Sequence, residues 1–243
     1  MLHIRHYIFL TTVLMIITIP VYSQVGERRT DFSIGINGGI TMNRMNFSPS
    51  IKQSQKINPT FGLSFRYISE KYFTAICGVL LELNYADLGW KELIEDGSNN
   101  TYIHSLHYLQ MPFLMQMGWG RERKGFKFMI EAGPQLGYCL GTSYQKGGAP
   151  WDPSNRPNHV VYQYDHDIDN NFDYGILAGL GLEYSNSGNH ILLNGRYYYG
   201  LGDTYDNSKK GYFARSANQT IEVKLTYMRD LSRLKKKKQN KTP

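Results

Sequence analysis

Cysteine and long apolar runs are scarce in this chain, and each shortage excludes a kind of structure. Only Cys77 and Cys139 are present among the 243 residues. The strand pattern described below places them at different heights and on opposite faces, so we expect free thiols and no cysteine metal site. After residue 23, the sequence has no run of the roughly 18 apolar residues that a transmembrane helix needs. We therefore expect no transmembrane helix in the mature chain.

Residues 1–23 have the layout of a secretory signal. Arg5 precedes the apolar run 7–19, and a proline and a small-residue pattern follow it. We expect cleavage after residue 23, and no cysteine lies there to carry a lipid anchor. The mature chain would then comprise a folded domain at 24–228 and a tail at 229–243.

The expected domain has no net charge, and the excess of basic residues is confined to the tail. Residues 24–228 carry nineteen acidic and nineteen basic residues, whereas residues 229–243 carry seven Lys or Arg against one acid. The basic run predicts a solvated tail, with contact to acidic lipid or to a partner protein as the alternative. An exported chain of this kind gives no reason to expect nucleic acid as a partner. The centre of the run is Lys235, Lys236, Lys237 and Lys238.

Eight segments alternate apolar and polar residues with a period of two, which indicates β-strands. In HYLQMPFLMQMGWG, residues 107–120, one parity carries Leu, Met, Phe and Trp while the other carries Gln and Pro. Each segment has about ten residues or more, enough for a tilted strand to cross a membrane. The predicted strands are 32–43, 58–68, 72–85, 103–118, 126–140, 172–185, 190–201 and 218–228.

The connections between these segments alternate in length. Outer-membrane barrels have tight turns at one end and long loops at the other, whereas a soluble β-sandwich has no reason to keep this order. The face opposite the apolar one combines charges with glycines, which suits a crowded lumen. The pattern therefore predicts an all-β protein, an eight-stranded antiparallel transmembrane β-barrel. The long connections are 44–57, 86–102, 141–171 and 202–217, and the short ones are 69–71, 119–125 and 186–189.

Four charged residues are predicted to face the lumen at similar heights. Since an unpaired buried charge is costly, we expect them to form an ionic network that fills the barrel, with a proton or ion path as the alternative. Eight strands enclose room for little more than side chains, which argues against an open nutrient pore. The four residues are Glu131, Arg196, Glu222 and Lys224.

Two local features are expected on the predicted strands. Pro112 cannot donate to a strand ladder, and a closed barrel has no free edge, so a bulge is expected there. Aromatic residues near strand ends are expected to form belts at the membrane interfaces. Those residues are Tyr72, Tyr85, Trp90, Trp119, Tyr138 and Tyr184.

The strings HYLQMPFLMQ, FMIEAGPQLGYCLG, FDYGILAGLGLEY and RYYYGLGD occur in this order along the mature chain. Their order, with YLxxP and AGPxLGY inside them, resembles the Bacteroidetes outer-membrane β-barrel family of PorT-like proteins, which are accessory to type IX secretion. The last loop, GDTYDNSKKGYFARSANQTI, looks closer to the secretion-associated members. The resemblance implies an outer-membrane location with both termini in the periplasm, and outer-membrane lipid and secretion-machinery proteins as partners.

Catalytic and metal-binding arrangements are weakly indicated. A small outer-membrane enzyme would need a nucleophile, a base and an acid near the rim, and the available residues form no recognisable motif. The string YDHDID at 164–169 offers oxygen and imidazole ligands, but its spacing matches no established metal loop. We therefore expect a non-enzymatic protein without catalytic residues, metal or cofactor, with a general surface barrel for envelope stability or external ligand binding as the alternative to secretion. The residues that an enzyme could use are His104, His107, His159, His166, Ser105 and Ser143.

Overall fold

The computed structural model describes residues 27–72, 74–121, 124–148, 150–154, 156, 159–208 and 211–231. The expected signal segment 1–23 and the basic run Lys235–Lys238 lie outside these residues. The described residues include no helix that is long and apolar enough to cross a membrane.

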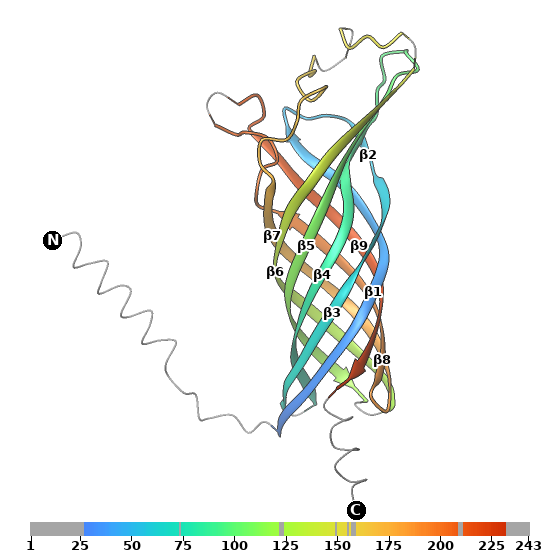
Figure 1. Cartoon of the computed structure of the whole chain (residues 1–243), viewed down its shortest axis with the longest axis vertical. Coiled ribbons are helices and arrows are strands. Elements are labelled where there is room, and N and C mark those ends of the chain that lie inside the picture. The colour runs from blue at the N-terminus through green and yellow to red at the C-terminus, as the bar shows by residue number, and fades with distance from the viewer. Residues whose placement is uncertain are drawn as a thin grey trace, which may run out of the picture.

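Eight long antiparallel strands form a closed ring (Figure 1). Around the ring the order is β1, β3, β4, β5, β6, β7, β8 and β9, and β9 pairs with β1. The two-residue strand β2, Gln53–Ser54, pairs with β4 above the ring. The predicted eight-stranded antiparallel barrel is therefore confirmed. The strands are β1 Glu27–Ser48, β3 Lys56–Tyr72, β4 Ala75–Glu92, β5 Thr101–Gly120, β6 Lys124–Gly147, β7 Phe172–Asn186, β8 Asn189–Gly200 and β9 Arg215–Asp230.

Most strands are longer than the alternation predicted, mainly at the long-loop end. β4 continues to Glu92 and β6 continues to Gly147, where the predictions ended at 85 and 140. In these upper parts the outward side chains include polar residues such as Lys91 and Ser143. The simple apolar-polar alternation therefore fades although the backbone pairing continues. As a result the longest loop is 148–171 rather than 141–171.

Short and long connections alternate around the ring, as predicted. The short turn 187–188 shows how the sequence closes a tight hairpin: Ser187 (φ 50°) and Gly188 (φ 97°) both have the left-handed backbone that a type I′ turn needs. β1 begins and β9 ends at the short-turn end, and the long loops gather at the opposite end (Figure 1). The long connections are 49–55, 93–100, 148–171 and 201–214, and the short ones are 73–74, 121–123 and 187–188.

The outer surface carries a continuous apolar belt. On β5 its outward side chains run from Leu109 to Trp119, all exposed. At roughly 3.3 Å per residue and a strand tilt of about 40°, this run is about 25 Å tall, the height of a bilayer's apolar band. The barrel therefore continues beyond the membrane at its long-loop end.

The aromatic residues expected in the belts fall into two groups. Tyr72, Trp119 and Tyr138 are exposed on the outer surface, as expected. Trp90, in contrast, is fully buried inside the barrel and packs on His104 with ring centroids 4.6 Å apart. The belt assignment of Trp90 is wrong because β4 extends to Glu92, which puts residue 90 on the inward parity.

Pro112 does not create the expected bulge. The β5–β6 register is the same at Pro112↔Gln135 and at Met115↔Ala132. The register shift in this pair lies between His107 and Tyr108, above the proline. The prediction that the two cysteines are not bridged is confirmed, since neither Cys77 nor Cys139 forms a disulfide.

Candidate functional site

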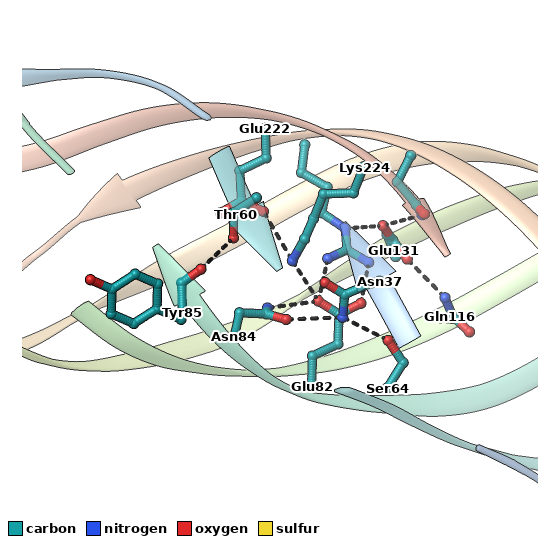
Figure 2. A network of polar contacts seen from close by, with 12 residues as sticks. Asn37, Thr60, Ser64, Glu82, Asn84, Tyr85, Gln116, Glu131, Glu222 and Lys224 are labelled. Atoms are coloured by element: carbon teal, nitrogen blue, oxygen red, sulfur yellow. Dashed lines mark hydrogen bonds and ion pairs between the residues drawn. The ribbon is translucent and has the colours of Figure 1, made fainter. Parts of the chain in front are cut away.

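Five charged side chains meet in the middle of the lumen and form what we call the upper cluster. They come from four strands of the ring: β4, β6, β8 and β9. All five are at most 2% exposed, so they lie fully inside the barrel. Figure 2 shows this network in its setting of amide and hydroxyl side chains. The upper cluster consists of Glu82, Glu131, Arg196, Glu222 and Lys224.

Arg196 joins the two sides of the lumen. Its Nη1 and Nη2 donate to the two carboxylate oxygens of Glu82 at 2.8 and 3.0 Å, and its Nε donates to Glu131 Oε1 at 2.5 Å. Glu82 also accepts from Lys224 Nζ at 3.0 Å. Glu222 lies 3.9 Å from Lys224 Nζ, at the edge of ion-pair distance. The structure thus brings together all four residues singled out in the sequence and adds Glu82 as the acceptor that connects them.

A glycine makes the Arg196–Glu131 contact possible. In the sheet, Glu131 is opposite Gly179 on β7, and Gly179 is opposite Arg196 on β8. A Cβ atom at residue 179 would lie 2.7 Å from Arg196 Cγ and 2.5 Å from the backbone oxygen of Gly195. The missing side chain therefore leaves the space through which the guanidinium group reaches the carboxylate.

Neutral side chains satisfy most of the remaining carboxylate oxygens of the upper cluster. Gln116 Nε2 donates to Glu131 Oε2 at 2.8 Å, and Asn194 Nδ2 donates to Glu131 Oε1 at 2.7 Å. Asn84 Nδ2 donates to Glu82 Oε2 at 3.0 Å. Buried ions that have both counter-ions and hydrogen bonds are fixed in position, and these side chains occupy the lumen at this level.

A second group of charges, the lower cluster, lies nearer the short-turn end. Glu183 Oε2 accepts from Arg66 Nη1 at 2.7 Å, and Glu183 Oε1 lies 2.8 Å from Lys127 Nζ. His190 Nδ1 is 2.6 Å from Glu183 Oε1, and His190 Nε2 is 2.9 Å from Asp230 Oδ1. The lower cluster consists of these residues, namely Arg66, Lys127, Glu183, His190 and Asp230.

The two clusters differ in their ratio of acids to bases. The upper cluster has three carboxylates against the cations Arg196 and Lys224, and the lower cluster pairs the carboxylates of Glu183 and Asp230 with Arg66, Lys127 and the ring of His190. The Ser185 hydroxyl completes the lower cluster, since it donates to Glu183 Oε1 at 3.0 Å and lies 3.0 Å from His190 Nδ1.

The residues that an enzyme could use are not brought together. His104 is fully buried and packs on Trp90. His107 lies on the opposite face of β5, with its Nδ1 at 3.1 Å from the hydroxyl oxygen of Tyr85. Ser105 Oγ accepts from Lys56 Nζ at 2.8 Å and bonds to neither histidine. His159 and His166 lie in the loop 148–171. Ser143 is exposed and is opposite Ser105 in the sheet.

The string at 164–169 has its own partners in the long-loop region. Asp165 pairs with Lys146, and His166 Nε2 lies 3.6 Å from Asp169 Oδ2. Among the described residues, no group of three or more His, Cys, Asp or Glu side chains is arranged to hold a metal ion.

The long loops are tied to one another by an ion pair. Arg156 pairs with Asp96 across two loops, and its guanidinium group lies over the ring of Trp151 at 5.1 Å. The pKa of Asp96 is lowered from its usual value by hydrogen bonds from the Ser98 hydroxyl and backbone N–H, and further by Arg156. The loops 93–100 and 148–171 are therefore tied together at the long-loop end of the barrel.

Sequence comparison identifies the class of protein. Residues 22–206 match the family described as outer membrane protein beta-barrel domain, and the chain belongs to this family. The chain is an outer-membrane β-barrel protein. Its polar lumen and apolar outer belt are the two surfaces that such a protein needs.

Solved structures that resemble the chain are distant in sequence. Neisserial surface protein A is 10% identical, with 82% of this chain and 97% of that chain covered and a TM-score of 0.44. The outer membrane enzyme PagL is 14% identical, with 81% and 97% covered and a TM-score of 0.38. The attachment invasion locus protein Ail of Yersinia pestis is 12% identical, with 83% and 99% covered and a TM-score of 0.33. No curated protein matches the sequence.

Proposed function

We propose that this protein is a non-enzymatic, PorT-like accessory or structural component of type IX protein secretion in the outer membrane. The observation that supports this role best is the filled lumen, where Arg196 bonds Glu82 and Glu131 across the barrel. A barrel whose interior is closed by ion pairs acts through its outer surfaces. The ordered strings HYLQMPFLMQ, FMIEAGPQLGYCLG, FDYGILAGLGLEY and RYYYGLGD supply the resemblance to the secretion-associated family.

In this proposal the short-turn end and both termini face the periplasm. The long loops face outward, as they do in outer-membrane barrels generally. Lys235–Lys238 would then present positive charge to a periplasmic partner of the secretion machinery or to the inner leaflet. Proteins that carry cargo to the surface are the expected partners, and no cofactor is required.

The test is a clean deletion of the gene in the native host, complemented with the wild-type gene. Mass spectrometry then compares the surface, periplasmic and culture-fluid proteins. Cargo that carries type IX C-terminal domains should disappear from the surface and accumulate in the periplasm, and complementation should reverse the change. Unchanged cargo would refute the secretion role.

A general surface barrel that binds an external ligand is the second candidate, and the Arg156–Asp96 tie between two long loops favours it. Replacing residues 148–171 with a short turn separates the two proposals. Secretion should survive this replacement, since the proposed contacts lie at the other end of the barrel. Because β9 runs to Asp230, the deletion that tests the tail begins after it. Deleting residues 232–243 should impair secretion while the barrel stays folded, and undiminished secretion would exclude the tail from this role.

A further inference from the structure

A cavity of about 540 Å³ opens on the outer surface of the barrel where β6, β7 and β8 pass from the apolar belt to the long loops. This volume lies within the roughly 300–1,000 Å³ of small-molecule sites. One wall is aromatic and comes from Tyr138, Phe172 and Tyr174. The opposite wall is polar and comes from the loop segments around Asp169 and Asp203. The position and the two walls together indicate which kind of molecule would fit.

The aromatic wall faces outward. Tyr138, Phe172 and Tyr174 are each about half exposed, at 52%, 53% and 47%. Tyr138 and Phe172 are register partners on neighbouring strands, and the rings of Phe172 and Tyr174 stack with centroids 6.2 Å apart. Exposed rings of this kind at the edge of an apolar belt lie at the level of lipid headgroups.

The polar wall is held in place before any ligand arrives. The backbone N–H groups of Asp169 and Asn170 donate to Thr204 O at 3.1 and 3.0 Å. Asn170 Nδ2 donates to Asp203 O at 3.0 Å, and Asn207 Nδ2 donates to Asp203 Oδ2 at 2.8 Å. These bonds join the loops 148–171 and 201–214 into one preformed surface. Binding then does not have to include the free-energy cost of ordering these loops.

The charges that line the cavity disfavour the binding of a phosphate group. Its described lining includes two aspartates and three asparagines but neither lysine nor arginine. Arg215, which contacts Asp203 of the lining, is already occupied, because it donates to Gly200 O at 2.7 Å, to Leu201 O at 3.2 Å and to Asp203 Oδ2 at 3.4 Å. An anionic group would therefore meet like charge, whereas uncharged hydroxyl groups can donate to carboxylates and bond to amides.

We propose that this cavity binds the sugar headgroup of a glycolipid in the membrane leaflet at the long-loop end. The C–H face of a sugar ring packs on the faces of Phe172 and Tyr174, while its hydroxyl groups bond to Asn171, Asn207 and Asp169. The lipid chains then lie along the apolar belt below. The inference is independent of the proposed role in secretion.

The proposal is tested with the full mature protein folded in dodecylphosphocholine micelles and titrated with dodecyl maltoside. Backbone NMR shifts of Asn171 and Gly202 should move and saturate. The apparent dissociation constant should rise by about tenfold in Tyr174→Ala, equivalent to one lost aromatic contact. Asn171→Ala, a surface change that leaves the strands intact, should weaken binding in the same direction. The matched control is Tyr197→Ala, which removes an outward tyrosine of 43% exposure away from the cavity and should leave binding unchanged.

Four results would overturn the proposal. The first is a shift that grows in proportion to the maltoside without saturating. The second is the same dissociation constant in Tyr174→Ala and Asn171→Ala as in the wild type. The third is saturation by free maltose at the same concentration, which would indicate a site for a free saccharide. The fourth is saturation of the same signals by calcium chloride alone, which would indicate a cation site at the aspartates.

Discussion

Replacing Arg196 with methionine should lower the free energy of unfolding by about 4 kcal/mol. The side chain is fully buried and its guanidinium group bonds the carboxylates of Glu82 and Glu131 at 2.5–3.0 Å. At an effective dielectric constant of about 20, two unit charges about 4 Å apart attract by about 4 kcal/mol. Removing one partner of a buried ion pair typically destabilises by about 3–5 kcal/mol, because the remaining charge stays buried without compensation.

A second substitution separates this mechanism from a simple loss of packing. In Arg196→Met with Glu131→Gln, one positive and one negative charge are removed together, and Glu82 keeps its contact with Lys224 at 3.0 Å. The double variant should therefore be about 2 kcal/mol more stable than Arg196→Met alone. The matched control is Arg44→Met on the outer surface, where the exposed arginine donates to the amide of Gln219 and the change should be within about 0.5 kcal/mol.

The assay is reversible urea unfolding of the barrel in lipid vesicles, followed by tryptophan fluorescence and circular dichroism. Equal stability of Arg196→Met and the wild type would refute the pairing argument. So would a double variant that is no more stable than Arg196→Met, because the uncompensated carboxylate would then not be the cause of the loss.

Three further outcomes are expected from other parts of the molecule. In the same assay, Glu183→Gln should destabilise by about 3 kcal/mol or more, since it leaves the buried cations Arg66 and Lys127 without the carboxylate that pairs with both. A loss below about 1 kcal/mol would contradict the lower cluster. Gly39→Ala should destabilise by about 1–3 kcal/mol, because the new Cβ would lie 2.0 Å from the backbone oxygen of Val223. The control is Gly195→Ala, where the new Cβ meets open space and stability should change by less than about 0.5 kcal/mol. The Asp96 pKa is lowered in the folded state, so the Asp96–Arg156 tie should be intact above the ordinary aspartate pKa of about 4 and lost as the pH falls further. Limited proteolysis of the long loops should accelerate only in that acidic range, and a rate that is independent of pH would exclude the tie.

The barrel itself could be predicted because its two faces require different residues. Lipid outside and a crowded polar interior impose a strict period of two on each strand, and this alternation survives in strands such as β7 and β8. The rule stops where the strands leave the membrane. Trp90 lies in such a segment. The alternation around it appeared to end at residue 85, so the sequence provided no strand parity from which its inward position could be predicted.

The charged network could be predicted only in part, for a geometric reason. Parity alone placed Glu131, Arg196, Glu222 and Lys224 in the lumen. Glu82 also has the inward parity of its strand, but its contact with Arg196 crosses the barrel between β4 and β8, which are not neighbours in the sheet. Such a contact depends on the stagger of the strands around the ring, and a single strand's sequence carries no information about that stagger. The same limit concealed the Arg66–Glu183 pair between β3 and β7.

These two cross-lumen pairs have a consequence for how the barrel is built. In the ring order, β4 and β8 are four strands apart in either direction, and so are β3 and β7. An open sheet that is still gaining strands holds Glu82 far from Arg196 and Arg66 far from Glu183, whereas Arg196 and Glu183 still have Glu131 and Lys127 on nearby strands. Hydrocarbon on that exposed inner face would meet the carboxylate of Glu82 and the guanidinium group of Arg66 without these partners, at a high energetic cost. The two cross-lumen pairs therefore form only when β1 and β9 meet and close the ring.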